Sequence, residues 1–314
     1  SVSYTPWFRA LGITDMFLAY VSYIHRIDEV SVAGGSLRYF SLGMVEFSDQ
    51  NGQKIADYKP HEFAIDGAYS RKLSERWSGG LALRYIYSNL SGNLFLNNVE
   101  TKPGQTFAFD LGIFYRKPDI KLGSKTMIFN WGLQLANIGA KISYSTSAQK
   151  DFLPAMFRTG ITPTINFDEK NSLSFSLEVH KLMVPTPEVS DTPVIAQKPS
   201  VVMGIIESWY KAPGGFQEKI IEFNVATGLE YWYASQIAFR TGFFWEHAYK
   251  GNRRFVNIGA SITYNILQFH VSYLIPVFQD ALPGGSVTSP LANTVRFSLI
   301  FNLTDIFSSK QENK

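Results

Sequence analysis

The chain contains no cysteine, so disulfide bridges and thiolate metal sites cannot contribute to its structure or its chemistry. Charged residues are scarce as well: they make up 18% of the 314 residues, whereas soluble domains average about 25%. The net charge of +3 produces no strong electrostatic field, and the chain has no basic run of the kind that follows a phosphate backbone. We therefore expect no nucleic-acid partner.

The chain also lacks a convincing membrane helix. Residues 255–279 contain no Asp, Glu, Lys or Arg and are the one serious candidate. Polar residues interrupt this run at mostly alternate positions, for example Asn257, Ser261 and Thr263. Such a rhythm is typical of two strands joined by a turn, which we place near Asn265.

Aromatic residues, by contrast, are abundant: they reach 15% of the chain, with 25 Phe and 16 Tyr. The stretch NSLSFSLEVHK at 171–181 shows how they are used, because apolar and polar residues alternate along it almost without exception. An extended chain with this pattern has one apolar and one polar face. Segments of this kind, roughly ten residues long and about fourteen in number, recur along the whole chain, in the length range of membrane-spanning strands. They lie near 1–6, 14–24, 29–40, 61–72, 77–88, 105–117, 126–136, 156–167, 172–181, 219–231, 235–245, 254–264, 267–274 and 293–303.

The connections between these segments alternate between short and long. Outer-membrane barrels have short periplasmic turns and long outer loops, whereas a soluble sandwich has no reason to sort its loops in this way. We therefore predict an all-β fold, a transmembrane antiparallel up-and-down β-barrel in an outer membrane, with both termini on the short-turn side. The predicted barrel covers residues 1–307 with long outer loops at 41–60, 89–104, 137–155, 182–218 and 275–292, and a polar tail covers 308–314.

Charged residues within the strands fall on the side opposite to the most apolar face. An Arg on the lipid face near the bilayer midplane costs roughly 2 to 4 kcal/mol, so these charges are expected inside the barrel. Acids and bases are nearly balanced there, which predicts paired charges across the lumen rather than a pore selective for one sign. The predicted lumen network consists of Arg38, Asp66, Arg84, Asp110, Arg116, Arg158, Glu178, Glu222, Glu230, Arg240 and Arg296.

The sequence offers little evidence for catalysis. The five histidines are scattered without the spacing of metal ligands, so no metal site is predicted. Glu178 and His180 share a strand face, which we interpret as a polar pair in the lumen wall rather than a catalytic pair. No nucleophile motif or phosphate-binding loop is present. We predict a protein that is not an enzyme and that has no cofactor.

The long loops are better candidates for function. Residues 182–218 begin with a Pro-rich polar run and then become apolar in VVMGIIESWY. An apolar patch outside the membrane indicates either a partner or a segment that folds onto the barrel, and the sequence leaves both possibilities open. The candidate contact residues in the loops are Val201, Met203, Ile205, Trp209, Tyr210, Phe278, Leu282 and Phe152.

Several blocks of the chain resemble a known family. They are SYTPW at 3–7, SLRYFSLG at 36–43, YKPHEFAIDGAYSRKLSERWSGGLALRYI at 58–86, TKPG at 101–104 and NTVRFSLIF at 293–301. Together they resemble the PorV (LptO) family, outer-membrane proteins of the type IX, or Por, secretion system of Bacteroidetes.

The resemblance implies a barrel similar to the FadL fatty-acid transporters, with loops that face the cell exterior. It also implies a role as a shuttle. PorV-like proteins bind the C-terminal domain of secreted cargo at a SprA/Sov-type translocon. They carry it to an attachment complex with a PorU-type sortase, PorQ and PorZ, where the cargo is anchored on lipopolysaccharide. The family has a segment before the first strand, and this chain is expected to begin without it.

The alternative function is that of a FadL-like transporter of small hydrophobic molecules, which would need an apolar pocket and an unpaired strand. Pro163 within the segment 156–167 could break strand pairing, because proline has no backbone donor. We interpret it instead as a proline at an edge or near the end of a strand.

Overall fold

The structure is a computed structural model that describes residues 1–9, 12–48, 51–92, 95–96, 99–145, 150–186, 199–277 and 294–303. Within these residues, 14 antiparallel strands close into a barrel, as the sequence predicts. The barrel strands are β1 (Val2–Pro6), β2 (Met16–Arg26), β3 (Ser31–Leu42), β6 (His61–Lys72), β7 (Trp77–Asn89), β10 (Gly104–Leu122), β11 (Lys125–Gly139), β12 (Met156–Asn166), β13 (Asn171–Leu182), β14 (Phe223–Tyr233), β15 (Ile237–Trp245), β16 (Arg254–Tyr264), β17 (Leu267–Pro276) and β18 (Thr294–Phe301).

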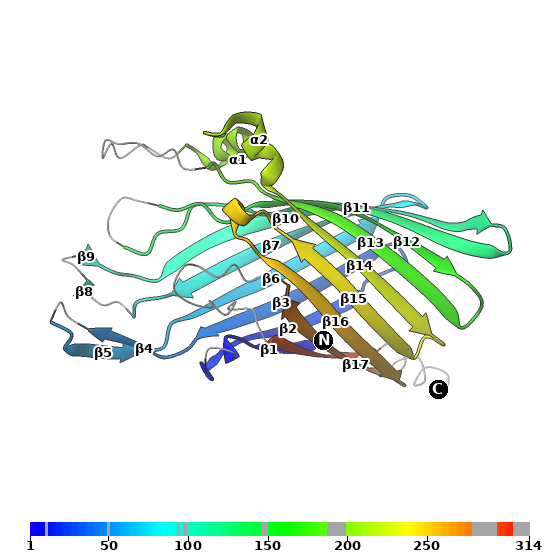
Figure 1. Cartoon of the computed structure of the whole chain (residues 1–314), viewed down its shortest axis with the longest axis horizontal. Coiled ribbons are helices and arrows are strands. Elements are labelled where there is room, and N and C mark those ends of the chain that lie inside the picture. The colour runs from blue at the N-terminus through cyan, green and yellow to red at the C-terminus, as the bar shows by residue number, and fades with distance from the viewer. Residues whose placement is uncertain are drawn as a thin grey trace.

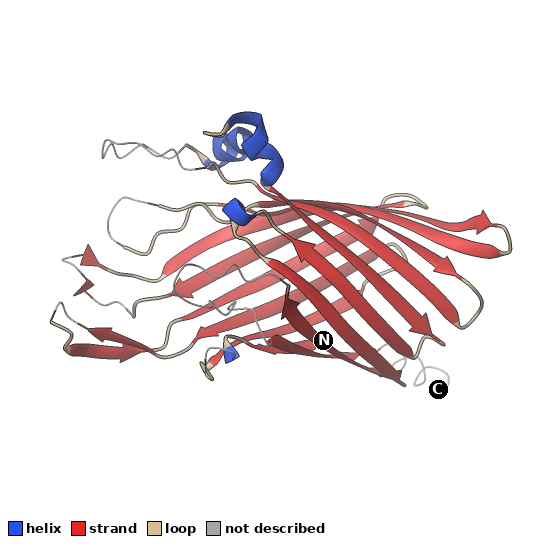
Figure 2. Ribbon diagram, viewed as in Figure 1, coloured by secondary structure: helices blue, strands red, loops and turns tan. Residues whose placement is uncertain are grey.

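The smaller elements gather at one end of the barrel, where the long connections are (Figure 1). These elements are the two-stranded sheets β4 (Val45–Ser48) with β5 (Lys54–Tyr58) and β8 (Phe95–Leu96) with β9 (Val99–Glu100), the helices α1 (Val201–Tyr210) and α2 (Gly215–Ile221), and the 3₁₀ turn η2 (Ala248–Lys250). Figure 2 shows how little helix accompanies the strands. None of the helices in the described part of the chain is long and apolar enough to cross a membrane.

The strand register assigns each residue to the interior or the exterior. Directly paired residues share a face, so Asp66 and Arg84, which pair between β6 and β7, point the same way. Residues one position away point outward, and Ile65 and Leu83 are accordingly more than half exposed. The same alternation continues around the barrel, except where the pairing of β10 with β11 shifts register. The result is a polar interior and an apolar exterior, which is the arrangement of a membrane barrel.

Tight turns join the strands at the opposite end. In two of them an aspartate organises the backbone: Asp28 accepts hydrogen bonds from the N–H groups of Val30 and Ser31, and Asp168 accepts them from Lys170 and Asn171. The pKa of Asp28 is lowered by its backbone bonds, and the pKa of Asp168 is lowered first by hydrogen bonds from the Asn171 side-chain amide and then by its backbone bonds. Such side-chain bonds are characteristic of tight turns, so the short connections are built by local sequence.

The structure corrects the sequence interpretation around residue 219. We expected a strand over 219–231, but α2 continues to Ile221 and β14 begins only at Phe223. The physical reason is that Lys219 and Glu222 are held by ion pairs beside the helices and are not part of a strand face.

The turn between β10 and β11 also lies further along than expected. We placed a short connection at 118–125, yet β10 continues to Leu122. A register shift between Lys117 and Ile120 lets the strand pass Pro118, and Asp119 adopts a φ of 59° there. A bulge of this kind accommodates a residue that cannot donate to the ladder.

Pro163 has a smaller effect. It pairs with Phe129 of β11, but the ladder between β12 and β13 skips from Ile161 to Thr164 without a change of register. The hydroxyl groups of Thr162 and Ser176 meet at 3.1 Å across this interruption. The wall therefore stays closed at Pro163, three residues before the end of β12.

Candidate functional site

An ion network lies on the interior wall between β3 and β11, centred on Arg84 of β7. The Arg84 guanidinium contacts Asp66 on β6 and bonds Asp110 on β10 at 3.0 and 3.3 Å. Arg38 on β3 reaches Asp66 at 3.0 Å. The Arg84 side chain is only 9% exposed, and a buried charge is tolerated when it is paired and hydrogen-bonded in this way.

Asn137 connects this network to the long-loop end. Its side chain accepts a hydrogen bond from Arg84, and its backbone N–H donates to Asp110 at 2.8 Å. Asn137 has a φ of 57° and lies where the pairing of β10 with β11 shifts register. Its side-chain amide also donates to the carbonyl oxygen of Pro154 at 3.2 Å. The network thus fixes the point at which the chain leaves the wall and begins the loop.

The described residues of the next loop, 140–145 and 150–155, lie at the barrel mouth, where Ile142 and Asp151 bond each other through their backbones. Ile142 and Leu153 form a small buried cluster with Ala108, an interior residue of β10. Between this loop and the ion network lies a cavity of about 480 Å³, with Arg38 and Arg84 on its wall side and Phe152 among the loop residues. The mouth is therefore narrowed by a packed loop.

The other half of the lumen wall carries isolated charge pairs. Arg240 of β15 bonds Glu230 of β14, and it also donates to the hydroxyl of Ser261. Ser261 is 2% exposed and lies 2.5 Å from His270 Nδ1. Its hydroxyl is closed to any substrate, so we assign it a structural role.

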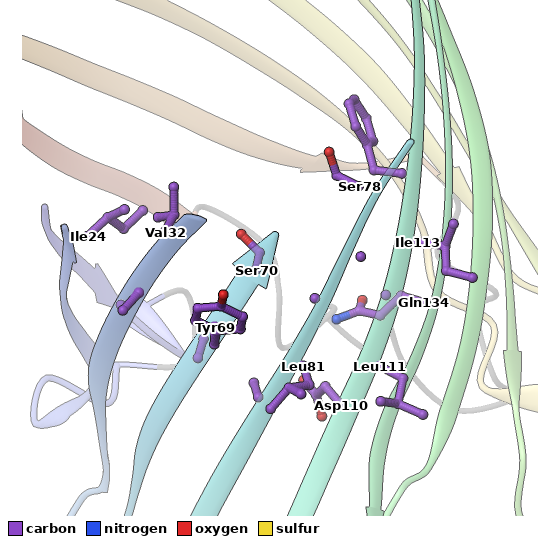
Figure 3. A pocket seen from close by; sticks show the side chains of 18 residues that line it. Ile24, Val32, Tyr69, Ser70, Ser78, Leu81, Asp110, Leu111, Ile113 and Gln134 are labelled. Carbon is purple, nitrogen blue, oxygen red and sulfur yellow. The ribbon is translucent and has the colours of Figure 1, made fainter. Parts of the chain in front are cut away.

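A second interior cavity, of about 530 Å³, lies between β3, β6, β7 and β10 (Figure 3). Gly80 and Gly112 have no side chains to fill this part of the wall, so the cavity is lined there by backbone. Asp110 and Gln134 add polar groups to the lining. Pairing of β7 with both neighbours is continuous across this region. The cavity is consequently a recess in a thin but closed wall.

Outside the wall, α1 and α2 form a structure that we call the two-helix cap (residues 199–222). Ser200 caps α1 by accepting a hydrogen bond from the backbone N–H of Met203 at 3.3 Å. The Trp209 ring lies 5.3 Å from Phe157 and 6.4 Å from Phe223, centroid to centroid. These two phenylalanines belong to the outward faces of β12 and β14, so the cap rests against the exterior of the barrel (Figure 1).

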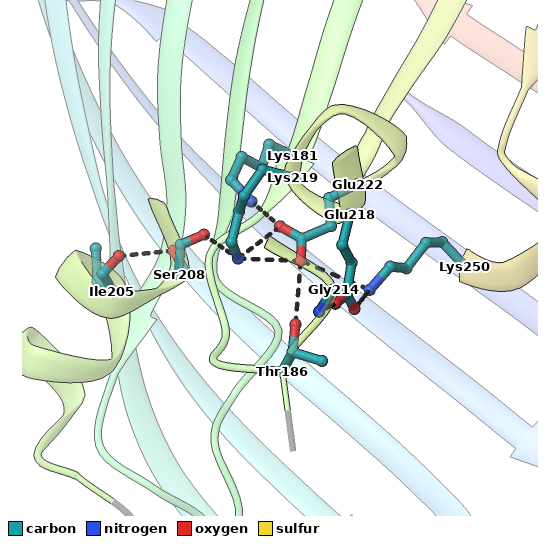
Figure 4. A network of polar contacts seen from close by, with 9 residues as sticks. All are labelled: Lys181, Thr186, Ile205, Ser208, Gly214, Glu218, Lys219, Glu222 and Lys250. Carbon is teal, nitrogen blue, oxygen red and sulfur yellow. Dashed lines mark hydrogen bonds and ion pairs between the residues drawn. The ribbon is translucent and has the colours of Figure 1, made fainter. Parts of the chain in front are cut away.

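A cluster of charged side chains holds the cap to the wall (Figure 4). Lys181, at the end of β13, is 1% exposed and bonds Glu222. Lys219 donates to both carboxylate oxygens of Glu222 at 3.1 Å and to the carbonyl oxygen of Ser208 at 2.9 Å. The Lys181 ammonium also lies 5.6 Å from the centre of the Trp209 ring. Strand, loop and both helices are thereby joined around one carboxylate.

The charges around this cluster keep its carboxyl groups ionised. Burial opposes ionisation of Glu222, but the Lys181 and Lys219 ammonium groups outweigh it and lower its pKa. The pKa of Glu218 is lowered as well, because Lys250 of η2 bonds it at 2.6 Å and the Gly214 N–H donates to it at 2.7 Å. Both acids act as anions that clamp the cap.

The opposite side of the cap exposes large apolar side chains, which we call the cap surface. Its most exposed members are Phe216 at 79%, Val202 at 67% and Tyr210 at 65%. Grouped exposed apolar residues outside a membrane mark a binding surface. The full set is Val202, Met203, Ile206, Tyr210, Phe216 and Ile220.

The structure brings most of the predicted loop candidates together. Val201, Met203, Ile205, Trp209 and Tyr210 all lie on α1, where Val201 and Ile205 are half-buried and the other three are exposed. Phe152 reaches α1 from the mouth loop: a Cβ atom on Gly204 would lie 2.9 Å from its ring. Phe278 and Leu282 lie outside the described residues.

The predicted lumen residues are less uniform. Strand register places Arg38, Asp66, Arg84, Asp110, Arg116, Arg158, Glu178, Glu230, Arg240 and Arg296 on the interior face. Glu178 lies 2.7 Å from His180, as the sequence suggests. In the described part of the chain Arg116 and Arg296 make no ion pair. Glu222 differs, because it lies outside the strands and belongs to the cap cluster.

Sequence reasoning missed Lys181, Lys219, Lys250 and Asn137. Lys181 alone carried a usable signal: it follows Leu173, Phe175, Leu177 and Val179 on the apolar face of one strand. A charge at that position must be covered by protein or reach the interface. Lys219 and Lys250 lie outside the strands, so no alternating pattern in the sequence singles them out.

A closed antiparallel barrel with a charged interior and an apolar exterior defines this protein as a transmembrane β-barrel. The sequence model of the family described as "Type IX secretion system protein PorV" matches residues 1–189, more than half of the chain. The chain therefore belongs to the PorV family, which makes it an outer-membrane component of the type IX secretion system.

Solved structures resemble the chain only distantly. The toluene transporter TodX of P. putida has 10% identity over 95% of this chain and 85% of its own, with a TM-score of 0.45. LpxR from Salmonella typhimurium has 9% identity over 96% and 98%, with a TM-score of 0.42. The toluene transporter TbuX of Ralstonia pickettii has 9% identity over 95% and 86%, also with a TM-score of 0.42. These scores carry no information on function, and no curated protein sequence matches the chain.

Proposed function

We propose that this protein binds the C-terminal domain of secreted cargo at a SprA/Sov-type translocon and carries it to the cell-surface attachment complex, without itself catalysing a reaction. Membership of the PorV family supports the secretion role. The observation that carries the proposal is the cap surface, an exposed apolar patch on a cap that an ion cluster clamps to the barrel. A shuttle needs such a surface outside the bilayer, where soluble domains can reach it.

In this proposal the long-loop end faces the cell exterior and the tight turns face the periplasm, as in outer-membrane barrels generally. Cargo leaving the translocon would meet the cap surface first. The attachment complex, with its PorU-type sortase and lipopolysaccharide acceptor, would receive the cargo on the same side. The organism would be a member of the Bacteroidetes.

The cap surface suits reversible binding. Its Tyr210 is 65% exposed and is an aromatic residue of the kind that dominates binding energy in protein interfaces. The cap is pinned by Lys181 and Glu222 and by packing of Trp209 on Phe157. Its backbone is therefore ordered before binding, which reduces the entropic cost of association.

The experiment is affinity purification of the tagged barrel from its own outer membrane, followed by identification of the proteins that come with it. We compare the wild type with an Ile206→Ser, Tyr210→Ser double variant. Both side chains are at least half exposed, so the substitutions leave the cap cluster intact. We expect recovery of cargo C-terminal domains or of the translocon to fall at least about tenfold, because two exposed anchors of roughly 1 kcal/mol or more each are lost.

A matched control is Ile55→Ser on β5, which removes an apolar side chain of similar exposure at the same end of the barrel. It should leave recovery unchanged. Equal recovery with the cap variant and the wild type would remove the cap surface from the proposal.

A second candidate function is transport of small hydrophobic molecules, in the manner of a FadL-like transporter. The interior cavity of about 530 Å³ favours it, because its lining includes the inward-facing Ile24 and Val32 (Figure 3). The continuous pairing of β7 with β6 and β10 does not. The same purification distinguishes the two functions: a barrel that carries a hydrophobic molecule in its lumen and no protein partner would favour transport.

A further inference from the structure

The exterior wall carries a groove that the secretion role does not use. It lies over Gly79 of β7 and has a cavity volume of about 510 Å³, within the range of roughly 300 to 1,000 Å³ typical of small-molecule sites. Leucine and isoleucine side chains form most of its lining, namely Leu73, Leu81, Leu111, Ile113, Leu133 and Leu135.

The groove exists because an outward-facing position lacks a side chain. Gly79 pairs with Arg71 on one side and with Ile113 on the other, so the three residues form one row across the exterior. In the next row Leu81 lies between Tyr69 and Leu111. A Cβ atom on Gly79 would already come within 3.2 Å of Leu73, so any larger side chain would fill the space.

One end of the groove is basic. Arg71 lines it and is exposed on the exterior face of β6. Within the described residues Arg71 has no carboxylate at ion-pair distance. Its charge interacts with Asp28 of the adjacent turn and with the hydroxyl of Tyr69, which also bonds Ser31 at 3.2 Å, and the guanidinium has further donors to offer an anion. An arginine on the lipid face costs up to about 1 kcal/mol near the membrane interface and more at greater depth, unless an anion accompanies it.

Aromatic residues fix the depth of that basic end. Trp77 lies two residues from Gly79 toward the tight turn, which is about 7 Å along a strand. Its ring lies 4.9 Å from Tyr115 and 5.9 Å from Trp131, and all three face outward. Trp and Tyr gather where lipid headgroups begin, and a long arginine side chain can reach that level.

We propose that this groove is a binding site for one phospholipid molecule, whose acyl chain lies over Gly79 and whose phosphate is bound by the Arg71 guanidinium. The groove is apolar along its length and cationic at the end nearest the headgroups, which matches a phospholipid of the leaflet on the tight-turn side. Guanidinium binds phosphate through two parallel hydrogen bonds, whereas detergent without an anionic group gains nothing from Arg71. The site depends only on the membrane barrel and not on the secretion role.

The test uses the full chain, purified in a mild nonionic detergent, stripped of lipid and then mixed with phosphatidylglycerol or lipopolysaccharide. Native mass spectrometry counts the bound molecules. We expect one tightly held phosphatidylglycerol per wild-type barrel. Arg71→Gln should weaken its binding about tenfold or more, the loss expected for one charged hydrogen bond, and Gly79→Leu should abolish it.

Two matched controls lie on the same part of the barrel. Gly67→Leu adds a side chain at another outward-facing glycine, which has open space around it and does not line the groove. Arg76→Gln removes a basic side chain from the adjacent turn. Both should bind like the wild type. Unchanged binding by Arg71→Gln, which has no reason to misfold, or preferential retention of lipopolysaccharide, would overturn the proposal.

Discussion

The lumen network and the cap cluster are built from the same chemistry but are held by different supports. In the lumen, Arg84 meets Asp66 and Asp110 on strands that are paired on both sides. In the cap, Lys181 is fixed on β13, but its partner Glu222 ends a loop segment that returns to the wall only at β14. The first set of charges cannot separate without opening the barrel.

We infer that the cap cluster separates more easily, because α1 and α2 are not hydrogen-bonded into the sheet and their charges would meet water if the cap moved away. Burying charges is costly in both places, and each network offsets that cost by pairing. The difference is that the lumen network strengthens a rigid wall while the cap cluster holds a part that could detach. We infer that the lumen network serves the stability of the barrel and the cap cluster serves the placement of the cap surface.

The largest effect should come from Arg84→Met. This change leaves Asp66 and Asp110 buried without their shared partner, and breaking a buried pair on one side typically costs about 3 to 5 kcal/mol. The free energy of unfolding, measured by urea denaturation of the refolded barrel, should fall by that amount. Arg116→Met, on the same interior face but with an exposed side chain, should change it by less than about 0.5 kcal/mol. Equal losses of unfolding free energy in the two variants would show that the ion network around Arg84 adds no stability beyond that of an unpaired interior arginine.

A smaller and more local effect is expected from Lys181→Met. The substitution keeps the aliphatic volume beside Trp209 and Phe223 but removes one cation from Glu222. Since Glu222 retains Lys219, the loss should be about 1 to 3 kcal/mol and should act on the attachment of the cap. Limited trypsin cleavage after Lys211 should accelerate roughly 5- to 150-fold, which corresponds to that free energy.

The unfolding midpoint of the barrel should stay unchanged in the same variant, and Lys181→Met combined with Glu222→Gln should recover part of the protection. A cleavage rate equal to that of the wild type would contradict the view of a clamped cap. A lowered unfolding midpoint in Lys181→Met would instead show that the cap cluster, like the lumen network, stabilises the barrel itself.

The difference between the two networks also explains what the sequence could predict. Asp66, Arg84 and Asp110 each fall on the polar face of their own strand, so the alternation of apolar and polar residues within each strand predicts that they face inward. The strands of the wall, the closure of the barrel and ten of the interior charges could be predicted in this way. Pro118 was misleading, because a bulge that lets a strand pass a proline depends on the partner strand and is not visible in local sequence.

The cap was harder, because its contacts join residues far apart in the chain. Lys181 and Glu222 are 41 residues apart, and Lys250 reaches Glu218 from another loop. Assigning Glu222 to the lumen followed from extending β14 backward by alternation, although helix α2 occupies that stretch. Ion pairs between residues distant in the sequence determine the structure of this segment. The alternation of apolar and polar residues carries no information about such pairs.

The smallest effect should come from acid, and it separates cap from barrel most cleanly. The pKa values of Glu218 and Glu222 are lowered in the folded protein, so their clamping is fully present above the ordinary glutamate value of about 4.3 and is lost as the pH falls through the folded values below it. The cap should therefore stay attached at pH 5 and loosen only below about pH 4.

Acrylamide quenching of Trp209, taken as the difference between the wild type and Trp209→Phe, reports this loosening. The circular dichroism of the strands should not change over the same range, because the strand pairing of the barrel does not involve these two carboxylates. Loosening already at pH 6 would mean that burial, and not the lysines, controls Glu222.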